Sequence, residues 1–278
     1  MSGEQIQDKN IEDNPWVDFS MRELPTTSVN GDCEFYLKEI ERCGRMEKVA
    51  HFIDEKLAVQ PKLYHSTEGF YADNPDYIDD LMANLDANEV NSLKKYTGTG
   101  VTGFVGINTV ARGFWDYEKM GRSDAETKAE INDTITFIDE AISKSPSPSE
   151  DFLTFRGTNL DAFRKYNINN IADLQSLKGE FYLERGFVST ALNRENSFAD
   201  REDTGLWFGG SNIEVRYHIP AGSHDFVALF TDELSYSPQQ TEVLINRWSL
   251  FYVSDVRVDE NKHAIVDMLL LPKDLYDY

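Results

Sequence analysis

A carboxylate and a carboxamide lie two residues apart at the start of a short apolar segment. Glu242 opens the run Val243-Leu244-Ile245, whose composition predicts a buried strand, and a polar, turn-rich loop precedes it. On a strand, Gln240 and Glu242 would point to the same face. A carboxylate at the mouth of a buried strand costs free energy unless it is paired or takes part in chemistry. Taken alone, this loop is also compatible with a solvated strand end that carries a glutamate.

Two other polar motifs lie on predicted strands earlier in the chain. Arg156 ends one strand and is followed by Gly157, and a second strand carries Ser189 and Thr190. Arginine offers a planar donor fork that suits phosphate groups, and glycine lets a backbone approach a ligand closely. Each motif on its own would be interpreted as a surface cation or as a strand hydroxyl with a local partner.

In this order, the arginine, serine and glutamate resemble the arginine–serine–glutamate class of mono-ADP-ribosyltransferases, the fold of the clostridial actin- and Rho-modifying toxins. Residues 93–100 with Ile107, Asn108 and Arg112 are similar to the family pattern YTG…G…IN…R. Residues 219–222 resemble its VPKG strand end, and residues 242–247 resemble its EVLLPR strand. The resemblance covers about residues 90–258. It implies an α+β fold in which a helical N-terminal part packs on a mixed, strand-rich core of two sheets.

The resemblance implies that NAD⁺ is the co-substrate, that no metal is required and that Glu242 is the central catalytic group. Glu242 would stabilise the oxocarbenium-like ribose that forms when the nicotinamide–ribose bond breaks. Ser189 would hold this carboxylate, and Arg156 would bind the pyrophosphate. The implied NAD⁺-binding residues are Tyr96, Asn108, Arg112, Arg156, Gly157, Ser189, Thr190, Phe198 and Arg201. Phe198 would stack on nicotinamide and Arg201 would clamp the phosphates from the loop after Ser189.

The sequence departs from the family pattern at two positions. Ala191 replaces a serine that often follows the Ser-Thr pair, and Gln240 stands where arginine-modifying members carry a second glutamate. A neutral amide can both donate and accept, which suits an asparagine-type or guanine-type acceptor better than an arginine. Gln240 would therefore act in catalysis and acceptor binding. Tyr236 would be the aromatic residue that grips the acceptor, although its register differs by one from the usual place.

The leading hypothesis is a bacterial or phage toxin that ADP-ribosylates an intracellular protein and hydrolyses NAD⁺ as a side reaction. One alternative keeps the chemistry but uses a nucleic acid or a nucleotide base as acceptor. A second alternative is an inactive NAD-fold that only binds a partner. A neutralising antitoxin or immunity protein is a further partner compatible with a toxin.

The chain contains 27 basic and 49 acidic residues among 278, a net charge of −22. This balance argues against an extended phosphate-tracking surface and against binding to anionic membranes, but is compatible with a small basic dinucleotide pocket. The five histidines lack metal-ligand spacing, so no metal site is expected. No GxGxxG motif follows a predicted strand, and Ser189 lacks a nucleophile-elbow context, which disfavours a dehydrogenase and a hydrolase.

Cysteine usage and the N-terminal sequence predict the compartment. Cys33 and Cys43 fall in one predicted helix, about 15 Å apart, which is too far for a disulfide and favours a reducing compartment. Residues 1–14 contain no apolar run, so no signal peptide is predicted. We expect a cytoplasmic site of action, which is compatible with delivery into a host cell by a signal-less route or a phage particle.

Periodicity predicts helices before about residue 147 and strands after it. Helices are expected over residues 33–58, 76–85, 88–96 (capped by Asn88), 101–115 and 124–143. Strands are expected over residues 152–156, 186–190, 213–219, 225–230, 242–245, 250–258 and 263–271. The sequence therefore predicts a flexible lead over residues 1–30 and one domain over 31–278. That domain would be mainly helical over 31–147, with a mainly β catalytic core over 148–278.

Overall fold

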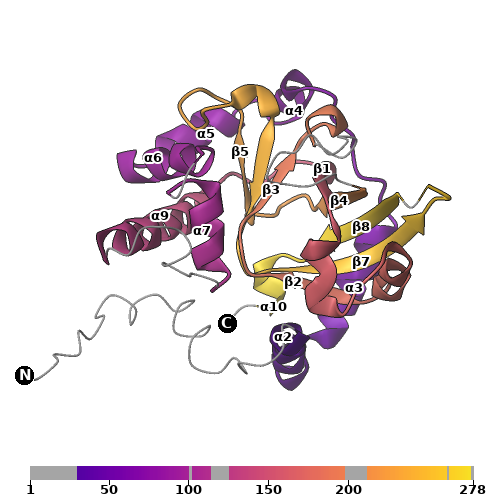
Figure 1. The fold of residues 1–278 in the computed structure, drawn as a ribbon. Coiled ribbons are helices and arrows are strands. Elements are labelled where there is room, and N and C mark those ends of the chain that lie inside the picture. Colours follow the sequence, from indigo (N-terminus) through magenta and orange to yellow (C-terminus); the bar gives the residue numbers. More distant parts are fainter. Residues whose placement is uncertain (1–29, 100–101, 114–124, 198–211, 262, 277–278) are drawn as a thin grey trace, which may run out of the picture.

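The computed structural model describes residues 30–99, 102–113, 125–197, 212–261 and 263–276. The predicted flexible lead, apart from its last residue, lies outside these ranges. The helices of the front half are α2 (Asn30–Arg42), α3 (Met46–Leu57), α4 (Thr67–Asp73), α5 (Tyr77–Asn84), α6 (Ala87–Tyr96), α7 (Phe104–Ala111) and α9 (Ala125–Ser143). As predicted, the part of the chain after this front half is rich in strands, which gives an α+β fold (Figure 1).

In the described part of the back half, eight strands form one hydrogen-bonded sheet. They are β1 (Phe152–Thr158), β2 (Phe181–Glu184), β3 (Val188–Ala191), β4 (Ile213–Ile219), β5 (Phe226–Leu229), β6 (Glu242–Ile245), β7 (Ser249–Val258) and β8 (Ala264–Leu270). Short 3₁₀ segments η1 (Leu160–Tyr166), η2 (Ile171–Leu177), η3 (Arg194–Asn196) and η4 (Pro238–Gln240) connect them, and α10 (Lys273–Tyr276) follows β8.

The strands follow the order β2-β7-β8-β4-β1-β3-β6-β5, and β4 and β8 are parallel whereas the other neighbours are antiparallel. β1 and β3 pair at Phe155 and Ala191, whereas β1 and β4 pair along seven residues. The five strands from β2 to β1 and the three from β3 to β5 are therefore two sheet sections that meet at one residue pair. These sections correspond to the two sheets that the family resemblance implies.

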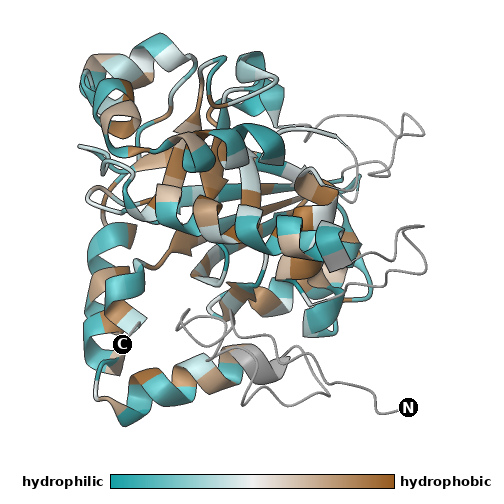
Figure 2. Ribbon diagram, turned by 90° about the vertical axis from the view of Figure 1, so that its left-hand side faces the viewer, coloured by the Kyte–Doolittle hydropathy of each residue, from teal (hydrophilic) through white to brown (hydrophobic). Residues whose placement is uncertain are grey.

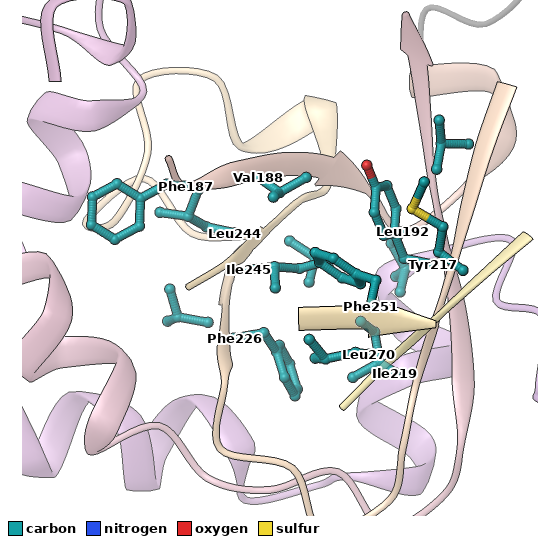
Figure 3. Close-up of a cluster of buried hydrophobic side chains, with 14 of the residues drawn as sticks. Phe187, Val188, Leu192, Tyr217, Ile219, Phe226, Leu244, Ile245, Phe251 and Leu270 are labelled. Atoms are coloured by element: carbon teal, nitrogen blue, oxygen red, sulfur yellow. The ribbon is translucent and has the colours of Figure 1, made fainter. Parts of the chain in front are cut away.

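Two clusters of buried apolar side chains hold the helices on the sheet. The larger cluster joins both halves of the chain, and Figure 3 shows Val188, Leu244 and Phe251 among the side chains packed inside it. The smaller cluster joins α2, α3 and α10 to β2, β7 and β8 through residues such as Ile40 and Leu250. In Figure 2, the interior strands carry much of the hydrophobic colour, and the helices alternate between hydrophobic and hydrophilic. Each fully buried Leu or Phe contributes about 1.5–3 kcal/mol to folding.

Three local predictions need correction. The helix expected over residues 33–58 is two helices, because Gly44 takes a left-handed φ of +66° between them. Cys43 therefore follows the end of α2, and Cys33 and Cys43 form no disulfide with each other. The N-cap of α6 is Asp86 and not Asn88: the Asp86 side chain accepts from the Glu89 N–H, and the Glu89 side chain accepts from the Asp86 N–H in return. Strand β2 was not predicted.

Candidate active site

Strand pairing brings Glu242 and Ser189 together. β3 lies between β1 and β6, with Ala191 opposite Glu242 and Ser189 opposite Leu244. Since side chains two apart share a strand face, the side chains of Ser189 and Ala191 lie on the face that also carries Glu242. The Ser189 side chain lies close enough to the Glu242 carboxylate to act on it as a hydrogen-bond donor, which lowers the pKa of Glu242. Sequence positions more than 50 residues apart thus meet because two short antiparallel strands pair in this register.

Glu242 is a buried carboxylate with 7% of its surface exposed. Burial raises the pKa of Glu242 to about 6, although the hydrogen bond from Ser189 and the charge of Arg156 act in the opposite direction. The group therefore stays ionised at neutral pH, and among the described residues Ser189 and Arg156 compensate for its removal from water. This is the environment in which a carboxylate interacts strongly with a positive charge that develops nearby.

Arg156 on β1 completes the predicted trio. Its Nη1 donates to the backbone oxygen of Ser189 at 3.0 Å, which ties the guanidinium to the neighbouring strand β3. The same side chain lines a cavity of about 660 Å³ that opens beside β1, η1 and the end of β2. The structure therefore brings Arg156, Ser189 and Glu242 together at the junction of the two sheet sections.

Gly157 and Thr190 have partners within the protein. The Gly157 N–H donates to the Ser197 backbone oxygen at 2.6 Å. Thr190 points to the opposite face of β3 from Ser189, and its buried hydroxyl donates to the Val243 backbone oxygen at 2.7 Å. Thr190 therefore links β3 to β6, and its contact with NAD⁺ stays a prediction.

Tyr96 on α6 and Asn108 on α7 are buried and joined by a hydrogen bond. Asn108 Nδ2 donates to the Tyr96 hydroxyl at 2.9 Å, and Asn108 Oδ1 accepts the Phe187 N–H at 2.8 Å. Burial and the charge of Glu242 both raise the pKa of Tyr96, so this phenol lies within electrostatic reach of the carboxylate. Both ends of the Asn108 amide bind the protein, so Asn108 joins α6 and α7 to the start of β3, and its contact with NAD⁺ stays a prediction.

Arg112 ends α7 and lines the 660 Å³ cavity with four other basic residues and two acidic ones. The other basic residues are Arg156, Arg164, Lys165 and Arg185, and the acidic residues are Asp161 and Glu184. The cavity lining is therefore positively charged, although the whole chain has a net charge of −22. The cavity is therefore suited to an anion, and phosphate is the group that arginine forks bind best.

Gly186 packs closely against the side chains of Asn108 and Arg112. A Cβ at Gly186 would lie 2.9 Å from Arg112 Nε and 2.9 Å from Asn108 Oδ1. Neither atom can move freely, because Arg112 Nε donates to Glu184 and Asn108 Oδ1 accepts from Phe187. We expect Gly186→Ala to lower the free energy of unfolding by about 1–3 kcal/mol, as overpacking does, and chemical denaturation measures this.

Gly69 on α4 provides the control for this prediction. A Cβ there would make only an ordinary contact, 3.5 Å from a ring carbon of Tyr64. Gly69→Ala should keep or raise stability, because alanine favours a helix more than glycine does. Equal stability of the two variants would contradict the close packing at Gly186.

The turn-rich loop before Glu242 and the strand over residues 242–245 are confirmed. Gln240 lies in the 3₁₀ turn η4, and Thr241 has a left-handed φ of +50°, so β6 begins at Glu242. Gln240 is therefore not on the strand, and the shared strand face considered for Gln240 and Glu242 does not apply. Pro238 at the first turn of η4 favours this turn over a longer strand. Gln240 is exposed, and Asn196 Nδ2 donates to the Gln239 backbone oxygen at 2.9 Å, which anchors the turn beside η3.

Tyr236 lies at the far end of the same loop, with 65% of its surface exposed. Its N–H donates to Thr97 Oγ1 at 2.9 Å, and Lys94 Nζ lies 5.3 Å from its ring centroid. The loop is therefore attached to the end of α6, and it presents an aromatic side chain to solvent on the way to Gln240.

Sequence reasoning missed Lys165, Tyr182 and Glu184, which all line the cavity. The only signal was a glutamate at the end of the apolar run 181–183, and β2 itself was not predicted. Phe198 and Arg201, expected on the phosphate–nicotinamide loop, lie outside the described residues. Among the residues with described positions, no three His, Cys, Asp or Glu side chains are arranged to hold a metal ion. In the same ranges, no helix has both the length and the apolar character that a membrane span requires.

Comparisons with known proteins point to one family. The family model for ADP-ribosyltransferase exoenzymes matches residues 74–273. The mono-ADP-ribosyltransferase C3 of Clostridium botulinum C phage is 26% identical over 151 residues, which are 50% of this chain and 56% of that protein. The chain thus spans little more than half the length of this curated relative.

Solved structures of the same kind share the fold. C3stau2 from S. aureus, solved with NAD, superposes with a TM-score of 0.58 at 22% identity over 77% of this chain and 100% of that chain. The C3 exoenzyme of Clostridium limosum gives a TM-score of 0.52 at 22% identity over 77% of this chain and 98% of that chain. Plx2a, an ADP-ribosyltransferase toxin from Paenibacillus larvae, gives 0.54 at 21% identity over 77% of this chain and 100% of that chain. The predicted fold class is therefore confirmed.

Proposed function

This chain belongs to the ADP-ribosyltransferase exoenzyme family, and from this membership we propose that it transfers ADP-ribose from NAD⁺ to an intracellular acceptor protein. NAD⁺ is the co-substrate, nicotinamide is the leaving group, and slow hydrolysis of NAD⁺ is a side reaction. The toxin-type relatives support a toxin or effector role inside a target cell. The catalytic unit in this proposal is residues 31–278 acting as one domain, which the apolar core shared by both halves supports.

The observation that carries the proposal is the buried Glu242 carboxylate, held by Ser189 and lying within electrostatic reach of Arg156. Cleavage of the nicotinamide–ribose bond moves positive charge onto the ribose as neutral nicotinamide departs. A fixed carboxylate in a desolvated site favours that charge more than it favours the ground state. Glu242 would also accept a hydrogen bond from a ribose hydroxyl, which orients the sugar for attack. Ser189 keeps the carboxylate oriented before the substrate arrives.

The basic cavity beside Arg156 supports binding of the dinucleotide. Its volume of about 660 Å³ lies within the usual range for ligand sites, and five basic side chains line it. Arg156 is fixed by its bond to the Ser189 backbone oxygen, so its guanidinium is oriented in advance. It would bind the pyrophosphate while the ribose lies toward Glu242.

The loop from Tyr236 to Gln240 supports a separate acceptor site. Both side chains are exposed on a loop attached to α6 at one end and to η3 at the other. Gln240 would bind an amide of the acceptor, since its carboxamide offers one acceptor and two donors. Tyr236 would supply apolar contact area to the acceptor surface.

We expect Arg156→Ala to weaken NAD⁺ binding by roughly tenfold or more, because a charge-assisted contact to phosphate is lost. Calorimetric titration of NAD⁺ into the purified protein measures this. Arg257→Ala is the control, because Arg257 lies on β7 and does not line the cavity. Unchanged affinity in Arg156→Ala would remove Arg156 from the NAD⁺ site.

A further inference from the structure

Glu184 lines the cavity and forms ion pairs with cations from two separate segments. It ends β2, and its side chain is 12% exposed. Its Oε1 accepts from Arg112 Nε at 2.9 Å and from the Gly186 N–H at 2.9 Å. Its Oε2 lies 3.6 Å from Lys165 Nζ and 3.4 Å from the Tyr182 hydroxyl. One carboxylate therefore holds a cation from α7 and a cation from η1.

Lys165 is a half-buried lysine, and its side chain is 17% exposed. Its Nζ donates to the Leu183 backbone oxygen at 2.6 Å and lies 4.4 Å from the ring centroid of Tyr182. Burial lowers the pKa of Lys165, and the negative charge of Glu184 opposes this shift. Two other charges face the ammonium, Arg112 from α7 and Arg185 from the segment after β2, and both lower its pKa. Glu184 therefore favours the charged form of Lys165.

Glu184 remains ionised over the whole physiological pH range. Burial alone would raise its pKa, but the charges of Lys165 and Arg112 and the Gly186 N–H bring the pKa to about 2. The group of one carboxylate and two cations therefore carries a net positive charge inside a cavity. A buried arrangement of this kind is a weak source of stability, because desolvation offsets most of the attraction. Binding of an anion at this wall explains the group of Glu184, Lys165 and Arg112 better than a contribution to stability does.

We propose that Glu184 is a positioning residue for the dinucleotide, which holds Lys165 and Arg112 on the cavity wall to bind a phosphate. This inference rests on the proposed use of NAD⁺. Arg112 uses its Nε–H for Glu184, and an arginine guanidinium has four further N–H donors on its two terminal nitrogens. Lys165 and Arg112 would extend the phosphate site that begins at Arg156, and Glu184 itself would not touch the substrate.

The test is Glu184→Gln, which keeps an acceptor for the Gly186 N–H and removes only the charge. We expect KM for NAD⁺ to rise by roughly tenfold, with kcat for NAD⁺ hydrolysis nearly unchanged. We also expect KM of the variant to rise with pH, starting at a lower pH than in the wild type, because Lys165 loses its proton more easily without the carboxylate. A residue with a merely structural role would not give this pH dependence.

Two further variants make the result decisive. Glu180→Gln removes the same charge from an exposed position just before β2 and should leave KM unchanged. Lys165→Met combined with Glu184→Gln removes the titrating group, so KM should stay high and become independent of pH. If Glu184→Gln does not fold, Lys165→Met alone gives the answer, with the same rise in KM expected.

Wild-type protein that hydrolyses NAD⁺, together with a Glu184→Gln variant of unchanged KM, would overturn the role of Glu184 and leave the proposed function standing. Equal loss of kcat and of folded protein in Glu184→Gln, with unchanged KM in Lys165→Met, would show that Glu184 only supports the fold. Wild-type protein without NAD⁺ binding would instead contradict the proposed function itself.

Discussion

Glu242→Gln is expected to lower both ADP-ribose transfer and NAD⁺ hydrolysis by on the order of a hundredfold or more. Glutamine has nearly the same shape as glutamate, so the Ser189 contact and the fold should persist while the negative charge is lost. The charge acts mainly when the ribose becomes cationic, so NAD⁺ affinity should change little. Nicotinamide release measures the rate, and calorimetry measures the affinity. A variant that retains a tenth of the wild-type hydrolysis rate would contradict the catalytic role of Glu242.

The same carboxylate predicts a pH profile for the wild-type enzyme. Only ionised Glu242 can stabilise the ribosyl cation, and burial raises its pKa to about 6. The value of kcat/KM should therefore fall about tenfold per pH unit below this pKa and be level just above it. In the NAD⁺ complex the positive nicotinamide ring favours the ionised form, so the limb of kcat should lie at lower pH. A profile that is flat from pH 5 to 8 would show that this carboxylate is not the titrating group.

Gln240→Ala is expected to separate transfer from hydrolysis. Gln240 is exposed on η4 and lies outside the cavity, so NAD⁺ and Glu242 should remain in place in the variant. Hydrolysis should continue near the wild-type rate, because water reaches the ribosyl cation without help from this amide. Transfer to the acceptor should fall by on the order of a hundredfold, because the attacking group loses the hydrogen bonds that align it. Label incorporation into a target-cell lysate and nicotinamide release are measured in parallel.

Gln239→Ala is the matched control, because Gln239 is exposed in the same turn and only its backbone oxygen contacts Asn196. Gln240→Glu sharpens the test, since a carboxylate there would disfavour an amide acceptor and favour an arginine. Parallel losses of hydrolysis and transfer in Gln240→Ala would show that Gln240 supports the NAD⁺ site, and the inference of a non-arginine acceptor would then fail.

The sequence predicted the parts of the site that short motifs encode. Glu242, Ser189 and Arg156 were found because each lies on or beside a strand with a recognisable pattern, and a family resemblance put them in one order. Their proximity follows from the pairing of β3 with β1 and β6, which joins positions far apart in the chain. Local patterns do not specify such long-range pairing, so the register and the sheet order came only from the structure.

The contacts that sequence reasoning missed are long-range and electrostatic. Arg112 and Glu184 are 72 residues apart, and the sequence around each residue does not indicate that the two form an ion pair. The contacts of Asn108 with Tyr96 and Phe187, which come from other segments, were not predicted either. The strand over residues 242–245 was predicted with the bounds of β6, but the 3₁₀ turn over residues 238–240 and the left-handed conformation of Thr241 were not. Local conformation was decided there by backbone restrictions that side-chain patterns do not reveal.

The central claim is that this protein cleaves NAD⁺ and attaches the ADP-ribose to a protein, and one labelling measurement tests it most directly. NAD⁺ that carries one label on adenine and another on nicotinamide is incubated with the purified protein and a target-cell lysate. The samples are then divided between nuclease and protease treatment. We expect the adenine label in a nuclease-resistant, protease-sensitive fraction, with the nicotinamide label released free in at least equal amount and both events absent with Glu242→Gln. Retention of both labels in intact NAD⁺, or an adenine label that only nuclease removes, would contradict the account.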